Sequence, residues 1–61
     1  MIYQNIKAIA AEQKVSISEI EEKCGITPRY MCTWDNITPG VDKVVAVARF
    51  LGVSVEELIK D

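Results

Sequence analysis

Three side chains that could contact another molecule cluster in the middle of the chain. Arg29, Tyr30 and Thr33 follow the pair Thr27-Pro28. A threonine directly before a proline is a typical start of a helix, because threonine caps free amides and proline fits the first helical position. We expect the three side chains to face outward from that helix, where they present a guanidinium, a phenol and a hydroxyl.

The sequence lacks most of the residues and motifs that catalysis and metal binding use. The chain has no histidine, no glycine-rich phosphate loop and no Cys-x-x-Cys pair, and its two cysteines are Cys24 and Cys32. A nucleophile needs an adjacent base, and the sequence shows no nucleophile with an evident base beside it. We therefore expect no enzymatic activity, no metal and no cofactor. We expect Cys24 to belong to a buried face and Cys32 to be more exposed.

The composition is that of one small globular domain, residues 1–61. Hydrophobic residues make up 49% of the chain and charged residues 26%, with a formal net charge of −2. No apolar run approaches the roughly 20 residues that span a bilayer, and no secretory signal pattern opens the chain. The cysteines form no disulfide framework, so we expect a reduced, cytoplasmic protein with no membrane partner.

Apolar residues recur at helical spacing in several segments. We predict about five short helices and no sheet. The expected segments are roughly Tyr3–Lys14, a two-turn helix after Ser16, 28–35, Val41–Leu51, and a short helix after Ser54. The fold class is therefore all-α, a compact bundle.

Local signals mark the ends of these helices. Ser16-x-x-Glu19 and Ser54-x-x-Glu57 have the spacing of capping boxes. Gly25 follows an apolar stripe at the place of a left-handed C-terminal cap, and Gly52 ends the helix through Leu51 in the same way.

Residues 17–36 have the pattern of a helix-turn-helix. Two short helices would meet across Gly25-Ile26-Thr27, and Met31 and Trp34 would give the second of them a buried side. We expect Trp34 to pack in the core, since its spacing from Met31 points inward. Outward residues of such a helix can reach base edges in a major groove about 12 Å wide.

The chain resembles the Cro/C1-type, or Xre-like, helix-turn-helix family of phage repressors and bacterial transcriptional regulators. The resemblance covers residues 6–58. It is carried by Gly25-Ile26-Thr27, by Trp34-Asp35-Asn36 and by the segment 50–58, FLGVSVEEL, which is similar to the closing segment of the family. It implies a lambda-repressor-like fold and a sequence-specific transcriptional regulator, acting as a homodimer on double-stranded DNA with helix three, about 28–35, in the major groove.

The resemblance also implies which residues contact DNA. In helix three, Thr27, Arg29, Tyr30 and Thr33 would face the bases or the backbone. Ser16 would lie near a phosphate at the start of helix two, where free amides favour an anion. From the other side, Thr38 and Lys43 would contact phosphates.

An alternative function is a protein-interaction module with weak or no DNA binding. The chain is acidic overall, and Glu19, Glu21 and Glu22 are expected to form an acidic patch on helix two. In the family, the position of Glu21 is often a small alanine that lets helices two and three pack closely, and the position of Ile17 is often a glutamine that contacts a phosphate. Because phosphate contacts supply most non-specific affinity, the loss of such a contact fits a protein partner as well as weak DNA binding.

Overall fold

The described part of the chain forms four α-helices and one turn of 3-10 helix. A computed structural model describes residues 1–60. The elements are α1 (Ile2–Gln13), α2 (Ile17–Cys24), η1 (Met31–Thr33), α3 (Val41–Leu51) and α4 (Val55–Ile59). The described residues contain no strand. The all-α class is thereby confirmed.

The ends of the helices follow the local signals in the sequence. The Ser16 hydroxyl accepts a hydrogen bond from the Glu19 amide at 3.0 Å, and the Ser54 hydroxyl accepts one from the Glu57 amide at 3.3 Å. Gly25 and Gly52 end α2 and α3 with φ of 69° and 71°, which glycine adopts without the steric cost of a Cβ.

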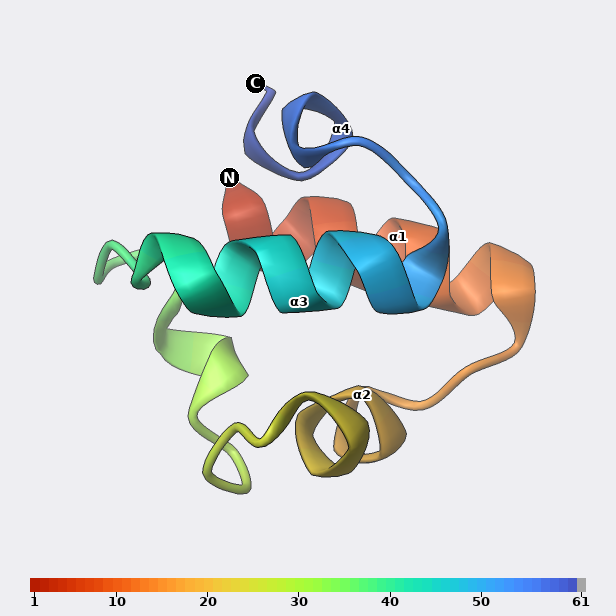
Figure 1. Ribbon diagram of the computed structural model, residues 1–61, viewed down its shortest axis with the longest axis horizontal. Helices are drawn as coiled ribbons and strands as arrows, with labels where there is room; N and C mark the ends of the chain where they lie inside the picture. The colour runs from red at the N-terminus through yellow and green to blue at the C-terminus, as the bar shows by residue number, and fades with distance from the viewer. Residues whose placement is uncertain (61) are drawn as a thin grey trace.

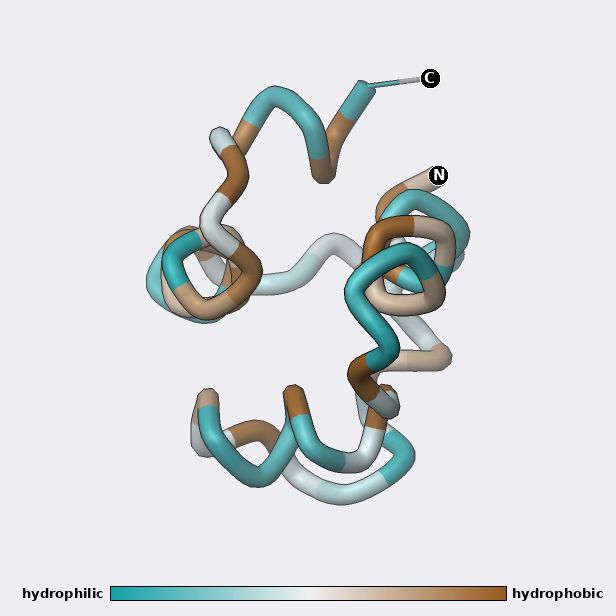
Figure 2. The backbone as a smooth tube through the Cα atoms, turned by 90° about the vertical axis from the view of Figure 1, so that its right-hand side faces the viewer, coloured by the Kyte–Doolittle hydropathy of each residue, from teal (hydrophilic) through white to brown (hydrophobic). Residues whose placement is uncertain are grey.

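The helices enclose a single apolar core. α3 crosses in front of α1 in Figure 1, with α4 on one side of the pair and α2 on the other. The end-on view in Figure 2 shows the same arrangement, with α4 and α2 at opposite ends. Each element contributes to the core, whose buried residues are Ile6, Ala10, Ile20, Ile26, Met31, Trp34, Val44, Val47, Ala48, Leu51 and Leu58.

Polar side chains of α1 donate hydrogen bonds to the C-terminal ends of α3 and α4. The Asn5 amide donates to the carbonyls of Leu58 and Lys60 at 2.9 and 2.6 Å. The Gln13 amide donates to the Leu51 carbonyl at 2.7 Å. These bonds satisfy carbonyls at the C-terminal ends of α3 and α4, which have no partner within their own helices.

The predicted helix over 28–35 is wrong. Only Met31–Thr33 is helical there, as a single 3-10 turn. Arg29 has a left-handed φ of 68°, which interrupts a right-handed helix directly after Pro28. The structure therefore has four α-helices where about five were predicted, and the helix-turn-helix is not confirmed.

Hydrogen bonding explains why this segment is not an α-helix. The Thr33 and Trp34 amides donate to the carbonyls of Tyr30 and Met31, three residues earlier. The Thr33 hydroxyl also donates to the Tyr30 carbonyl, at 2.7 Å. Bonds over three residues define the tighter 3-10 geometry, so these carbonyls do not serve an α-helical ladder.

No helix within residues 1–60 is both long and apolar enough to cross a bilayer.

Candidate nucleic-acid interface

The segment from Gly25 to Met31 is a turn fixed by one buried carboxylate. Glu21, on α2, is only 4% exposed. Its two oxygens accept hydrogen bonds from the backbone amides of Arg29 at 3.0 Å and Met31 at 3.1 Å. Bonds from amides to a carboxylate are stronger than neutral ones, so Glu21 holds the shape of the turn.

The predicted acidic patch of Glu19, Glu21 and Glu22 is therefore wrong for Glu21, which is buried. Glu19 and Glu22 are exposed on α2, but Glu21 points inward with Ile20. The spacing could have predicted this burial, because Ile17, Glu21 and Cys24 fall at i, i+4 and i+7 and so lie on one side of the helix.

The turn presents Arg29 and Tyr30 to solvent. Both side chains are exposed, Tyr30 by 47%. The segment lies at the lower edge of the molecule in Figure 1, between α2 and η1. The backbone that carries these side chains is fixed by Glu21, so they project from a rigid support.

The two threonines of this segment differ in their surroundings. Thr27 is exposed, and its carbonyl accepts the Tyr30 amide at 2.9 Å to close the turn. Thr33 is half-buried in η1, and its hydroxyl proton is donated to the Tyr30 carbonyl. The Thr33 hydroxyl is therefore less free to contact a partner than that of Thr27.

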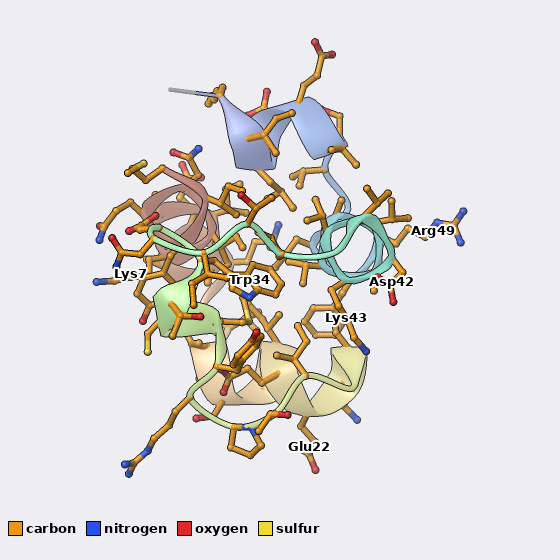
Figure 3. The ribbon with its side chains drawn as sticks, turned by 90° about the vertical axis from the view of Figure 1, so that its left-hand side faces the viewer. Lys7, Glu22, Trp34, Asp42, Lys43 and Arg49 are labelled. Carbon is orange, nitrogen blue, oxygen red and sulfur yellow. The ribbon has the colours of Figure 1, made fainter. Side chains whose placement is uncertain are left out.

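Lys43 reaches the same turn from α3. Its ammonium donates to the Gly25 carbonyl at 3.0 Å, where α2 ends. Figure 3 shows the labelled Lys43 side chain extending from α3 toward α2. A cation at the C-terminal end of a helix also interacts favourably with the helix dipole. Lys43 thus lies at the Gly25 end of the segment, and part of its hydrogen-bonding capacity is used within the protein.

Ser16 and Thr38 lie apart from the turn. Ser16 caps the N-terminus of α2, and the helix spans eight residues, about 12 Å, between Ser16 and Gly25. Thr38 is exposed in the loop between η1 and α3. The structure thus places Thr27, Arg29 and Tyr30 in one turn, with Thr33 after it in η1, while Lys43 contacts the segment only at Gly25. No contact joins Ser16 or Thr38 to that turn among the described residues.

The carboxylates of Glu21 and Asp35 both accept hydrogen bonds from backbone amides. Besides Glu21, Asp35 accepts the amide of Tyr3 at 2.9 Å and so caps the first turn of α1. Three cations surround the segment 25–31: Arg29 in the turn, Lys23 in the last turn of α2, and Lys43 at Gly25. The exposed Glu22 partly opposes their charge.

Cys24 lies next to Lys43, at the end of α2. Desolvation by burial raises the pKa of the Cys24 thiol, and the Lys43 ammonium partly offsets this shift. Cys32 is exposed, and its thiol contacts the Arg29 carbonyl at 2.9 Å. The expected contrast in exposure between the two cysteines is confirmed.

The hydrogen bonds by which Glu21, Asp35 and Lys43 join separate parts of the chain have no signal in the sequence that predicted them. Each bond joins residues that are between 8 and 32 positions apart. Trp34 was placed correctly, since it is 3% exposed, although its indole nitrogen has no hydrogen-bond partner among the described residues.

Comparison with known protein families and with curated proteins finds no match to this chain.

Proposed function

We propose that the chain is a sequence-specific, DNA-binding transcriptional regulator that contacts the major groove through the turn 25–31. The observation that carries the proposal is the bidentate contact of the Glu21 carboxylate with the Arg29 and Met31 amides. It supports a rigid turn from which one guanidinium and one phenol project into solvent.

The exposed groups of the turn have the chemistry that DNA recognition needs. An arginine can donate two hydrogen bonds to the O6 and N7 atoms of a guanine. Arg29 is exposed and carries that group in this protein. The Tyr30 and Thr27 hydroxyls can contact base edges or phosphates, and Lys43 adds a positive charge at the Gly25 end of the segment.

The net charge of −2 is compatible with this role, because the distribution of charge matters more than the sum. Lys23, Arg29 and Lys43 lie around the turn, whereas Glu56 and Glu57 lie on α4, on the other side of the molecule. So few cations imply few phosphate contacts, and hence an affinity that falls only moderately with salt.

The experiment is selection of a preferred duplex from a random pool, followed by affinity measurements on variants. Arg29→Ala is expected to weaken binding to the selected site about tenfold or more, the loss of about 1–3 kcal/mol from one bidentate contact. Lys7→Ala is the matched control, since Lys7 is an exposed cation of α1 that stacks on Tyr3. Equal affinity of Arg29→Ala and the parent would remove Arg29 from the interface.

A second candidate function is binding of a protein partner. It is favoured by exposed apolar side chains in the loop after η1 and at the start of α3: Ile37 is 50% exposed and Val41 78% exposed. The exposed Glu19 and Glu22 fit a basic partner. A stoichiometric partner that is lost from the Glu19→Lys/Glu22→Lys variant, with no DNA binding by the parent, would support this function in place of the first.

A further inference from the structure

We propose that the outer face of α3 binds a second copy of the chain, with the two α3 helices packed antiparallel about a two-fold axis. The outer face consists of Val41, Asp42, Val45, Ala46, Arg49 and Phe50. The proposal concerns the protein without DNA and does not depend on the proposed function.

The outer face lies opposite the core side of α3. The core side consists of Val44, Val47, Ala48 and Leu51, all buried. At 100° per residue, the six residues of the outer face span the other half of the helix. α3 lies at the front of Figure 1, and among residues 1–60 no other element passes in front of it.

The composition of this face is unusual for a helix surface in water. Val41 is 78% exposed, Phe50 is 38% exposed, and Val45 and Ala46 are half-buried. A helix that is apolar on both sides is expected where both sides are covered, and solvent-facing positions normally carry polar residues. The outer face thus has the composition of a contact surface.

Its two charged residues are of opposite sign and lie on the same side. Asp42 and Arg49 are seven residues apart, or about two helical turns. Figure 3 shows both labelled side chains pointing away from the protein on the same side of α3. Neither has an ion-pair partner within the described residues, where the one salt bridge joins Lys60 and Glu57.

The order of residues along the face is self-complementary. A two-fold axis between Val45 and Ala46 places Asp42 of one copy opposite Arg49 of the other, and does so twice. Val41 and Phe50 lie on the two edges of the outer face, beside this central line of charges. A symmetric interface requires this reciprocity, in which a residue of one patch meets its complement in the same patch of the other copy.

Small residues at the centre allow the helices to approach. Val45 and Ala46 lie at the crossing point, and interaxial distances of 8–10 Å require modest side chains there. The interface is limited to one 11-residue helix and its surroundings. Interfaces this small are weak and transient, so the dimer forms at high protein concentration.

The axis also keeps the two DNA-facing turns on one side of the dimer. It runs perpendicular to α3 and parallel to the outer face, so α2 of both copies lies below the paired helices in the view of Figure 1. The arrangement would let one dimer present two turns to one duplex.

The test is sedimentation equilibrium without DNA, over about 10 μM to about 1 mM protein, a range that covers weak association. Asp42→Arg puts like charges opposite each other, and Arg49→Asp does the same with the opposite sign. We expect each variant alone to associate at least tenfold more weakly than the parent. Mixed in equal amounts, they restore both opposite-charge pairs and are expected to form a heterodimer.

The double variant Asp42→Arg/Arg49→Asp separates association from effects on the helix. Asp42 and Arg49 also suit the dipole of α3, in its first and last turns, so both single variants lower the stability of the monomer. The double variant reverses both dipole contacts yet restores the pairing. It is therefore expected to be less stable than the parent and still dimeric.

Glu12→Arg is the matched control, because it makes the same charge change on an exposed position of α1. It is expected to leave the association of the parent unchanged. A parent that stays monomeric over the whole range, or single variants that do not associate when mixed, would overturn the proposal. DNA binding by a monomer would be unaffected by that result.

Discussion

The Glu21 carboxylate accepts a hydrogen bond from the backbone amide of Arg29 at 3.0 Å, and Arg29 itself has a left-handed φ of 68°. The same carboxylate accepts the Met31 amide, so two amides of an irregular segment are satisfied by one buried side chain. A left-handed arginine is disfavoured by roughly 1–2 kcal/mol, and the carboxylate offsets that cost. The contact holds the backbone from which the exposed Arg29 side chain projects.

Removal of the Glu21 carboxylate is expected to destabilise the protein strongly. Glu21→Ala leaves the Met31 amide buried without a partner, at a cost of about 2–3 kcal/mol in the free energy of unfolding. Urea denaturation followed by circular dichroism measures it. Glu22→Ala, which removes an exposed neighbour, should change stability by less than about 0.5 kcal/mol. Equal effects of the two substitutions would contradict the role of Glu21.

Glycine at position 29 is expected to separate stability from binding. Arg29→Gly relieves the left-handed strain and should raise the free energy of unfolding by about 1 kcal/mol. It also removes the guanidinium, so affinity for DNA should fall. Arg29→Ala, the control, should lower affinity without the gain in stability. If glycine and alanine gave equal stability at this position, φ of Arg29 would not be positive in solution.

Local signals in the sequence were sufficient to predict the positions of the four α-helices. The predicted helix Tyr3–Lys14 is observed as Ile2–Gln13, and Gly25 and Gly52 cap helices as predicted. Helix ends of this kind depend on residues within one turn, so they can be identified from the chain alone.

The segment 28–35 could not be predicted in the same way. Thr27-Pro28 signals a helix start, but the conformation is decided by Glu21, seven residues before Pro28. The left-handed residue is an arginine, whose type gives no indication of positive φ, unlike glycine. The exposure of Arg29 and Tyr30 was nevertheless predicted correctly, since Met31 and Trp34 point inward in either conformation.

Asp35 is expected to stabilise α1 from a distance. Its carboxylate accepts the Tyr3 amide, which has no partner within α1, so it acts as an N-terminal cap supplied by another part of the chain. Asp35→Ala should lower the free energy of unfolding by about 1 kcal/mol, and Asp35→Asn by less, because the amide oxygen still accepts. Thermal denaturation measures both. Glu12→Ala removes an exposed carboxylate of α1 and is expected to have little effect; a similar loss there would assign the Asp35 effect to charge alone.

The two thiols are expected to differ in reactivity. Burial raises the pKa of Cys24, so at pH 7.5 less of it is thiolate, the reactive form, than at an exposed cysteine. Cys32→Ser, which retains Cys24, should therefore react more slowly with a thiol reagent than Cys24→Ser, and its rate should rise as the pH increases above about 8.5. In denaturing urea the two rates should become equal. A faster reaction of Cys24 in the folded protein would contradict its desolvation.

Binding of DNA by the turn 25–31 is tested most directly by fluorescence anisotropy with random duplex DNA, repeated over a series of salt concentrations. The slope of the logarithm of the binding constant against the logarithm of the salt concentration is about −0.9 for each phosphate neutralised. We expect a slope that corresponds to two or three phosphates, from Lys23, Arg29 and Lys43, and a smaller slope for Lys43→Ala. Absence of binding by the parent at the lowest salt concentration would contradict the proposed function.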